Sequence, residues 1–400
     1  MSNPRPKDHR EIGRELELFF FDEISPGSAF WLPKGMIIFK ELEKLIRSVI
    51  DNRGYQETST PIIVKSELFK KSGHWEFFKE NMFNFKVDKE EYSIKPMNCP
   101  ESAVIFASKT RSYKDLPIRL SEFGRLHRNE RSGTLNGMFR VRQFVMDDAH
   151  VFCRPDQIQS EITEMLDVTL ELYKKLRLPV TFGLATRPEK AMGTKETWDK
   201  AEQQLADALK SHKIDFTILK GEGTFYGPKI HIDFKDFLDR IWTMATIQVD
   251  FQIPDRMGLE YIDKVGKAQR PVIIHRAILG TFERFVGIIT EQYQGAFPVW
   301  LSPIQAIVLP LSDKFTPYAQ KVAGDLKSAA IRAEVDVRNE TLQAKIRDAT
   351  LQKIPYLLIV GEKEEKAVSI AVRTREGEDL GQMTLKKFVA KISNDIATRA

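Results

Sequence analysis

The stretch FGRLHRNERSGTLNGMFRVRQFVMDDAHVF, residues 123–152, reverses its charge along its length. Its first two thirds hold one acid, Glu130, against the arginines Arg125, Arg128, Arg131, Arg140 and Arg142. Its last third holds Asp147, Asp148 and His150. Because guanidinium groups bind phosphate oxygens in a bidentate manner, the arginines around the SGTLNG turn predict either a phosphate clamp or a solvated, charged hairpin. The acids and the imidazole predict either a metal site or simply the polar side chains of a strand.

Length and composition limit the class of protein around this stretch. At 400 residues, with 42% hydrophobic and 29% charged residues, the chain fits two globular domains. The formal charge of +5 is compatible with a polyanionic partner but does not require one. The apolar runs are shorter than the roughly 18 residues of a membrane span, and the pattern of the first residues predicts no secretory signal. Because Cys99 and Cys153 are the only cysteines, we exclude a disulfide framework and expect a reducing, cytoplasmic location.

Hydrophobic periodicity outlines the elements on either side of the opening stretch. Helical patterns are predicted at residues 35–50, 156–177, 196–212 and 276–293. Alternation of apolar and polar residues predicts antiparallel strands at 229–234 and 246–251, and Pro61 marks the strand at 55–64 as an edge or a kink. The prolines in GAFPVWLSPIQ, residues 295–305, mark a boundary. Beyond it, strands that alternate with helices at 316–329 and 341–352 predict a small α/β domain.

One cysteine and two histidines outside any local motif are able to bind a metal. Cys99 in KPMNCPES, His150 in DDAHVF and His275 in VIIHRAILG would leave one position of a tetrahedral zinc ion open, as in catalytic sites. Their spacing follows no local rule, so the residues alone do not favour this set over His127, His231 or Cys153.

Two further segments have both a functional and a purely structural interpretation. GEGTFYGPKI, residues 221–230, presents Tyr226 and Lys229 on a glycine-rich turn, which is either a ligand-binding turn or a plain hairpin. HRAILGTFERF places Arg284 in an apolar segment. A buried arginine needs an anionic partner, such as a nucleotide phosphate, or a path for its head group to solvent.

Taken together, these segments resemble the class II aminoacyl-tRNA synthetases. RGYQETSTPIIV is similar to their motif 1, LHRNE with the run to RVRQF to motif 2, and ILGTFERF to motif 3. Within that class, GRELELFFFDEISPGSAFWLPKG, KSGHWEFFKENMF, KPMNCP, LSEFGRLHRNERSG, DDAHVFC, TRPEKAMG, FYGPKI and TIQVDF resemble the threonyl-tRNA synthetase family. The resemblance runs from about Asp8 to the C-terminus and is specific, because many unrelated motifs recur in one order.

The resemblance implies an α+β catalytic domain with an antiparallel sheet, the class II synthetase fold, over residues 1–298. A small α/β anticodon-binding domain would follow over residues 299–400, and the chain would form a homodimer through motif 1.

By position, the family's zinc ligands fall on Cys99, His150 and His275. Its ATP-binding residues fall on Arg128, Glu130, Arg140, Phe144 and Arg284, with Arg128 and Arg284 in catalytic contact with phosphate. Its threonine-binding residues fall on Asp148, Tyr226, Lys229 and Gln248. Its anticodon-reading residues fall on Asn339, Glu364 and Arg373.

The implied reaction is ATP-dependent activation of threonine and its transfer to tRNA(Thr). Arginines and Mg²⁺ would stabilise the charge that develops on ATP as pyrophosphate leaves. Zn²⁺ would act as a selector for the hydroxyl group of threonine. A site built around a hydroxyl rejects an analogue without it by about 10⁴ to 10⁵, whereas the one methyl group that separates serine from threonine is worth only about 10 to 200-fold.

Several features depart from the family pattern. The chain begins close to the catalytic domain, so we expect no editing domain in cis. Serine errors would then be tolerated, or a separate protein would correct them in trans, or the product would not be a translational tRNA. Substituted positions of the catalytic domain are Glu101, Ser102, Asn136, Met146, Thr243 and Met244. These substitutions leave two alternatives beside a threonine–tRNA ligase. One is a paralogue that activates threonine or a related amino acid for another acceptor, or that acts as an inhibitor-resistant duplicate. The other is a catalytically silent tRNA-binding protein.

Overall fold

The computed structural model describes residues 5–236 and 238–399. The chain divides into two compact units. One comprises Met1–Phe20, Phe30–Lys44 and Val286–Ala400, and the other comprises Phe21–Ala29 and Leu45–Phe285. The helices α2 (Pro33–Ile50) and α9 (Phe282–Gln292) each have residues in both units. Within the described ranges, every helix is too short or too polar to cross a membrane.

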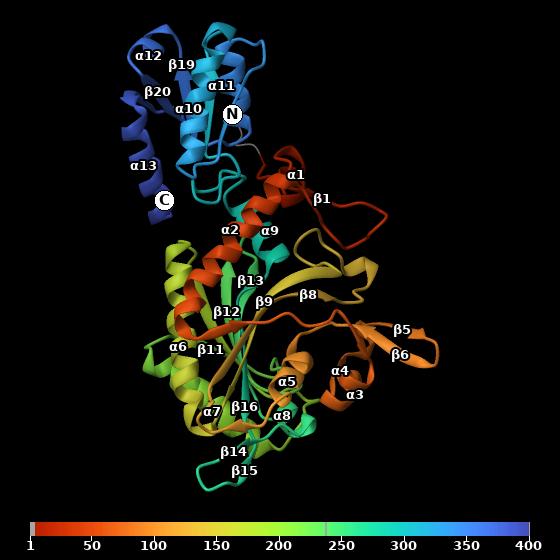
Figure 1. Cartoon of the computed structure of the whole chain (residues 1–400). Coiled ribbons are helices and arrows are strands. Elements are labelled where there is room, and N and C mark those ends of the chain that lie inside the picture. Colours follow the sequence, from red (N-terminus) through yellow and green to blue (C-terminus); the bar gives the residue numbers. More distant parts are fainter. Residues whose placement is uncertain (1–4, 237, 400) are drawn as a thin grey trace. The chain divides into compact units, whose positions relative to one another are not determined.

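The larger unit is built on an eight-stranded sheet in the order β11-β10-β12-β13-β16-β9-β8-β3 (Figure 1). Its strands are β3 (Tyr55–Glu57), β8 (Ile118–His127), β9 (Gln143–Cys153), β10 (Val180–Ala185), β11 (Phe216–Leu219), β12 (Lys229–Lys235), β13 (Ile241–Asp250) and β16 (Val272–Thr281). The six inner strands pair in antiparallel fashion, while β11 and β3 join the two edges in parallel. The predicted antiparallel sheet is therefore confirmed, with a parallel strand at each edge.

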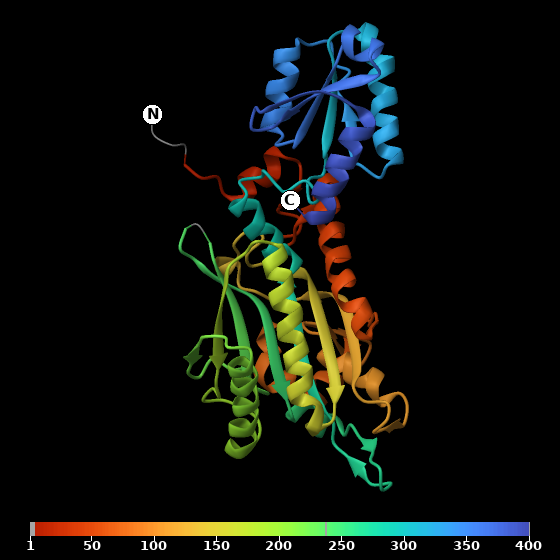
Figure 2. The same ribbon diagram turned by 90° about the vertical axis from the view of Figure 1, so that its left-hand side faces the viewer.

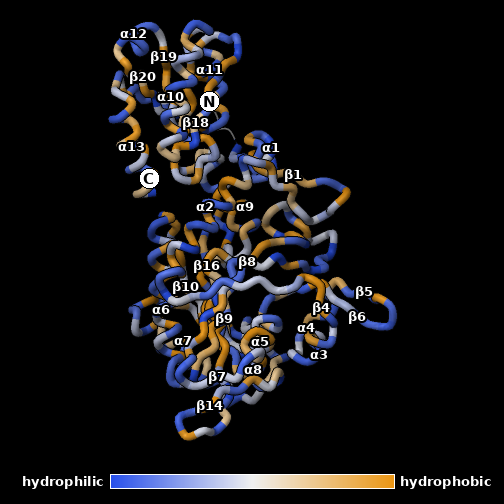
Figure 3. The backbone as a smooth tube through the Cα atoms, in the orientation of Figure 1, coloured by the Kyte–Doolittle hydropathy of each residue, from blue (hydrophilic) through white to orange (hydrophobic). Residues whose placement is uncertain are grey.

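The opening stretch of the sequence forms two adjacent strands of this sheet, between β16 and the edge strand β3. β8 and β9 are the two sides of a long hairpin, and the SGTLNG turn lies in the loop that joins them. Hydrophobic residues follow β9 and β16 in Figure 3, because these strands are covered on both faces. The strand predicted at 55–64 is interrupted around Pro61 into β3, which lies at the sheet edge, and β4 (Ile63–Lys65). This outcome is the edge or kink that the proline predicted.

Helices cover the two faces of the sheet differently. The helices α6 (Ile158–Lys175) and α7 (Lys195–Ser211), both predicted from periodicity, lie along one face (Figure 2). The opposite face carries α5 (Cys99–Ala107) and α8 (Gln252–Met257), with α3 (Glu67–Ser72) and α4 (His74–Phe78) beside them. Small sheets complete this unit: β4 with β5 (Phe83–Val87) and β6 (Glu90–Ile94), and β7 (Arg111–Ser112) with β14 (Tyr261–Ile262) and β15 (Ala268–Gln269).

The prediction of a helix over residues 276–293 is wrong for its first third, residues 276–281. Residues up to Thr281 belong to β16, and α9 begins at Phe282. The apolar run RAILG is buried in both interpretations, so its hydrophobicity could not separate a central strand from a buried helix. Gly280 has φ +69, and a Cβ there would lie 2.7 Å from the carbonyl oxygen of Met244. This left-handed residue, next to a register shift between Ala277 and Thr281, ends the strand before the helix starts.

The smaller unit contains the predicted α/β domain. Its five-stranded sheet has the order β18-β17-β19-β20-β21, with parallel pairs around β17 and antiparallel pairs beyond β19. The strands are β17 (Ala306–Pro310), β18 (Ala333–Val335), β19 (Tyr356–Val360), β20 (Ser369–Thr374) and β21 (Asp379–Thr384). The helices are α10 (Thr316–Ser328), α11 (Leu342–Leu351), α12 (Glu362–Lys366) and α13 (Leu385–Thr398). The same unit holds α1 (His9–Glu15), β1 (Phe19–Phe20) and β2 (Phe30–Trp31).

Candidate active site

A cavity of about 440 Å³ opens on the face of the large sheet that carries α5. Neighbouring strands supply its polar side chains: Asp148 and His150 come from β9, Gln248 from β13 and His275 from β16. Side chains of one strand face the same way at every second position, so Asp148 and His150 share a face of the sheet. The register pairs His150 with His275 and therefore brings two distant histidines together. Strand pairing, which spacing could not reveal, creates this cluster.

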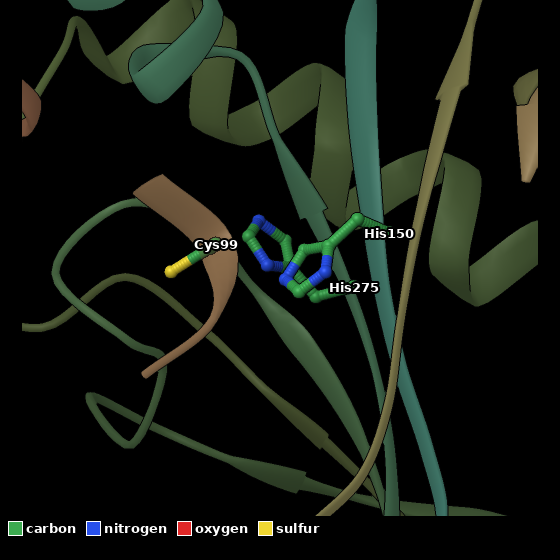
Figure 4. A group of neighbouring side chains, drawn as sticks. All are labelled: Cys99, His150 and His275. Atoms are coloured by element: carbon green, nitrogen blue, oxygen red, sulfur yellow. The ribbon is translucent and has the colours of Figure 1, made fainter. Parts of the chain in front are cut away.

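Cys99, His150 and His275 form a group at this cavity that is able to hold a metal ion (Figure 4). Each is buried, and their ligand atoms all lie within 4.8 Å of one another. The two imidazole rings have centroids 4.9 Å apart and are nearly perpendicular. Cys99 reaches the group from the first position of α5. Of the candidates that spacing left open, His127, His231 and Cys153 lie outside this group.

The chemistry of this donor set fits a zinc ion. Burial and the neighbouring His275 lower the pKa of His150 well below its ordinary value, so its ring stays neutral, which is the form that binds metals. Burial and the nearby Asp148 raise the pKa of the Cys99 thiol. A divalent cation would offset the effects of burial and of Asp148 on Cys99, because it stabilises the thiolate. Ser102 contacts Nδ1 of His150 and Asp250 contacts Nε2 of His275, which leaves the other ring nitrogen of each histidine for a metal. Nε2 of His150 lies 3.9 Å from Oδ2 of Asp148.

The remaining residues expected to bind threonine line the same cavity. Asp148 accepts a hydrogen bond from Nδ2 of Asn98 at 3.0 Å, and burial raises the pKa of Asp148 to about 6. The Tyr226 hydroxyl donates to Oε1 of Gln248 at 2.7 Å. Lys229 lines the cavity, and its pKa is lowered by burial. The four predicted residues are thus brought together.

Asp147 and Asp148, adjacent in sequence, lie on opposite faces of the sheet. Asp147 accepts from Nη1 of Arg276 at 3.0 Å and from the backbone amides of Ile278 and Leu279. The idea that both acids of the DDAH segment belong to one metal site is therefore wrong. Asp147 instead holds the bulged end of β16 in place.

A second cavity, of about 470 Å³, adjoins the first and shares Arg128, Thr281 and Arg284 with it. Its lining also includes Glu130, Arg140 and Phe144, so all five residues expected at the ATP site meet here. Arg128 lies over the ring of Phe144, with its guanidinium carbon 5.1 Å from the centroid.

The charges in this second cavity favour a bound anion. Arg140 pairs with Glu130 at 2.9 Å. Arg128 and Arg284 have no such ion pair among the residues that the structure describes, and Arg284 donates through Nε to the carbonyl of Phe139. Burial lowers the pKa of both arginines, which means that their charges are poorly solvated. An anion between them would stabilise both cations.

Most of the substituted positions also lie at these cavities. Met146, Thr243 and Met244 line the first one, and Asn136 lines the second. Ser102 contacts the ring of His150 at 3.1 Å. Glu101 is only 4% exposed, and neither of its carboxylate oxygens has a hydrogen-bond partner in the described part of the chain. Burial raises its pKa to about 8.

The three residues expected to read the anticodon lie on separate elements of the smaller unit. Asn339 is exposed in the segment between β18 and α11. Glu364 lies in α12, where its carboxylate accepts from the backbone amide of Gly361. Arg373 lies in β20 and donates through Nε to the carbonyl of Gly377.

Sequence reasoning missed three residues that contact the predicted site. Asn98 holds Asp148, Asp250 holds His275, and Nε2 of His74 lies 3.2 Å from the sulfur of Cys99. Asn98 and Asp250 were visible only as part of the motifs KPMNCP and TIQVDF. Nothing in one sequence marks a buried polar residue as the neighbour of a ligand.

Comparisons with known families and structures agree with this fold and geometry. Residues 83–293 match the tRNA synthetase class II core domain (G, H, P, S and T), and residues 305–395 match an anticodon binding domain. The fold is thus that of a class II aminoacyl-tRNA synthetase. Within that class, the chain belongs to the threonyl-tRNA synthetase family.

Three relatives carry this assignment. The RNA binding domain of threonyl-tRNA synthetase from Cryptosporidium parvum Iowa II superimposes with a TM-score of 0.94 at 44% identity, over 97% of this chain and 98% of that one. Threonine–tRNA ligases of Halorhodospira halophila and Prochlorococcus marinus are each 48% identical over 98% of this chain. The chain spans 61% of the length of the first and 62% of the second.

Proposed function

We propose that the chain activates threonine with ATP and transfers it to tRNA(Thr). The observation that carries this proposal is the meeting of a Cys-His-His donor group and Asp148 with Arg128 and Arg284 in two adjoining cavities. These two arginines are partly buried and have no ion pair among the residues that the structure describes. One cavity suits a small amino acid with a hydroxyl group, and the other suits a polyphosphate. The proposed domains are residues 1–298 for catalysis and 299–400 for anticodon binding.

In the second cavity, ATP would be held by its phosphates and its base. Arg128 would contact the α-phosphate and Arg284 the γ-phosphate, with Mg²⁺ bound to the nucleotide. Glu130 and Arg140 would orient ATP. Phe144 already carries Arg128 on one face of its ring, and adenine would stack on Phe144.

In the first cavity, Cys99, His150 and His275 would hold Zn²⁺, and Asp148 would accept the threonine hydroxyl. The zinc ion would supply open coordination positions for the amino and hydroxyl groups of threonine. Valine would then leave Asp148 without a partner, a loss that rejects such analogues by about 10⁴ to 10⁵. Tyr226, Lys229 and Gln248 would complete the pocket.

The residues of the second cavity would stabilise the charge that develops in the transition state of the activation step. The carboxylate of threonine attacks the α-phosphorus of ATP, pyrophosphate leaves, and an aminoacyl adenylate forms. Arg128 and Arg284 are preorganised at the position where phosphoryl charge develops, which is typically worth several kcal/mol. The terminal ribose hydroxyl of tRNA then attacks the carbonyl carbon of the adenylate, and AMP leaves.

The proposed partners are tRNA, a second copy of the chain and a separate editing protein. The anticodon binding domain would recognise tRNA through Asn339, Glu364 and Arg373. A homodimer would form at the motif 1 region, where β3 is an edge strand with one free side. The pocket distinguishes serine from threonine by one methyl group, worth about 10 to 200-fold, so a separate protein that removes serine from tRNA is part of this proposal. The expected location is the cytoplasm.

Exchange of radioactive pyrophosphate into ATP, measured with threonine, serine and valine and then with tRNA charging, tests the proposed function. We expect exchange with threonine, weaker exchange with serine, and none above background with valine, followed by charging of tRNA(Thr). Exchange without charging would favour an enzyme for another acceptor, to which the lining residues Met146, Thr243 and Met244 would be adapted. Absence of exchange with all three would leave a tRNA-binding protein.

A further inference from the structure

The second nitrogen of each histidine in the donor group has a fixed partner. Nε2 of His275 lies 3.0 Å from Oδ2 of Asp250. Nδ1 of His150 lies 3.1 Å from the hydroxyl of Ser102. Asp250 has no exposed surface, and its other oxygen accepts from the backbone amides of Gln252 at 2.6 Å and Ile253 at 3.0 Å. The carboxylate is therefore anchored at the start of α8 on one side and contacts the imidazole on the other.

The two partners constrain their histidines differently. An ionised carboxylate only accepts hydrogen bonds, so Asp250 requires the proton of a neutral His275 to be on Nε2 and leaves a lone pair on Nδ1. A serine hydroxyl both donates and accepts, so Ser102 is compatible with either tautomer of His150. The ring of His275 is also packed, because it stacks on Tyr226 with centroids 4.9 Å apart. Its orientation and its tautomer are thus both set before a metal arrives.

We propose that Asp250 is the positioning residue that makes His275 a metal ligand through Nδ1. His150 binds the same ion through Nε2, and the hydroxyl of Ser102 donates or accepts as the tautomer of His150 requires. This inference rests on the zinc site of the proposed function. Second partners of this kind typically change metal affinity by 10 to 100-fold when they are removed.

Replacing Asp250 by asparagine separates this role from simple packing. The asparagine oxygen can still accept from the amides of Gln252 and Ile253. Its amide nitrogen, however, would donate to Nε2 of His275, which moves the ring proton to Nδ1, the atom that should bind zinc. The same logic applies wherever an aspartate that orients a histidine is changed to asparagine.

The chain offers a matched control for this substitution. Asp263 accepts from the backbone amides of Val265 and Lys267, both at 2.9 Å, and from the side chain of Gln269 at 3.0 Å. Like Asp250, it accepts from two backbone amides and contacts one further side chain, but that side chain is Gln269 and not a histidine of the donor group. Asp263→Asn should therefore leave zinc affinity unchanged.

Zinc affinity is measured on the metal-free full-length chain by competition with a chromophoric chelator, and the spectrum of bound Co²⁺ reports the thiolate ligand. We expect Asp250→Asn to weaken zinc binding at least tenfold, Ser102→Ala to weaken it less, and Cys99→Ser to remove the cobalt–thiolate band. Equal affinities of Asp250→Asn and Asp263→Asn would overturn the inference. So would a wild-type chain that binds no zinc, or that binds it as tightly after Cys99→Ser.

A second measurement needs no variant at Asp250. In ¹⁵N spectra of the metal-free wild-type chain at pH 8, the imidazole signals that disappear in His275→Gln should show the proton on Nε2. A proton on Nδ1 would contradict the inference even if Asp250→Asn failed to fold. Threonine-dependent pyrophosphate exchange by the wild-type chain is scored separately, so an enzyme that is active with a different ligand geometry refutes this inference and leaves the proposed function intact.

Discussion

Asn98 shows how much one buried amide can determine at this site. Its Nδ2 donates to Asp148, the residue proposed to accept the substrate hydroxyl. Its Oδ1 is buried without a hydrogen-bond partner among the residues described here. This amide fits only because residue 124 is glycine, since a Cβ there would lie 2.3 Å from Oδ1 of Asn98. Asn98 and Gly124 thus act as one unit that orients Asp148.

Asn98→Ala should raise the KM for threonine about tenfold or more and leave the KM for ATP nearly unchanged. A hydrogen bond to a charged group contributes about 1.5 to 3 kcal/mol. Gly124→Ala should act in the same direction, because it displaces the amide. Steady-state pyrophosphate exchange measures both constants, and Asn394→Ala on the exposed side of α13 is the control. A threonine KM equal to that of the control would refute the role of Asn98.

The raised pKa of Glu101 predicts that the free energy of unfolding of the chain falls as the pH rises. Its pKa in the folded chain is raised to about 8 by burial, against 4.5 for an exposed glutamate. Below pH 4.5 both folded and unfolded chains hold this proton. As the pH rises from 4.5 to 8, only the unfolded chain releases it, so the free energy of unfolding falls by at most about 1.4 kcal/mol per pH unit.

Glu101→Gln removes this titration and should stabilise the chain at pH 8 but hardly at pH 4.5. Urea unfolding of wild type and variant at both pH values measures the difference in the free energy of unfolding. Glu164→Gln is a suitable control, because its side chain is 40% exposed. A difference between wild type and Glu101→Gln that is the same at both pH values would contradict the raised pKa.

At the scale of elements, the junction of β16 and α9 decides how the two cavities meet. β16 carries His275 to the first cavity, and α9 carries Arg284 to the boundary of both. The turn between them depends on Asp147, which binds Arg276 and the amides of Ile278 and Leu279 from the opposite face of the sheet. The bulged end of β16 is therefore held by a buried ion pair whose carboxylate, Asp147, does not line the cavity.

Asp147→Ala should lower the free energy of unfolding by about 3 to 5 kcal/mol, because it leaves Arg276 buried and unpaired. Arg276 is 1% exposed, and two of its guanidinium nitrogens have no hydrogen-bond partner within the described ranges. Urea unfolding tests this value, with Asp167→Ala on α6, whose side chain is 63% exposed, as the control. A loss no larger than that of the control would show that Asp147 is dispensable for the junction.

At the scale of the whole molecule, the two cavities and the anticodon binding domain lie in different compact units. Activation and tRNA recognition should therefore respond to different substitutions. Arg373→Ala should lower kcat/KM for tRNA charging about fivefold or more, since a charged contact contributes about 1 to 3 kcal/mol, and should leave threonine-dependent exchange unchanged.

The control for Arg373→Ala is Arg347→Ala, which removes an arginine of the same domain whose side chain is 71% exposed. Charging is measured as a function of tRNA concentration, and exchange is measured on the same preparations. Equal charging by the two variants would contradict a role for Arg373 in tRNA recognition. A parallel loss of exchange would show that the substitution acts through the catalytic unit.

The sequence by itself determined most elements and predicted a set of residues that line the two cavities. Period-two alternation identified β12 and β13, and helical periodicity identified α2, α6, α7, α10 and α11, because these patterns report which face of an element is buried. The motif residues predicted at the ATP and threonine sites line the two adjoining cavities. Uniformly apolar segments were ambiguous, so the start of α9 was placed six residues too early, at 276 instead of Phe282.

Only the tertiary structure decided which residues meet. Strand register pairs His150 with His275 and directs Asp148 into the cavity while Asp147 points away, because neighbouring residues of a strand face opposite sides. Cys99 joins them from a helix packed on the same face. Asn98, Asp250 and the anchoring of Asp147 follow from side-chain contacts between segments far apart in the chain. Such contacts depend on packing in three dimensions, which residue types and their spacing along one chain do not encode locally.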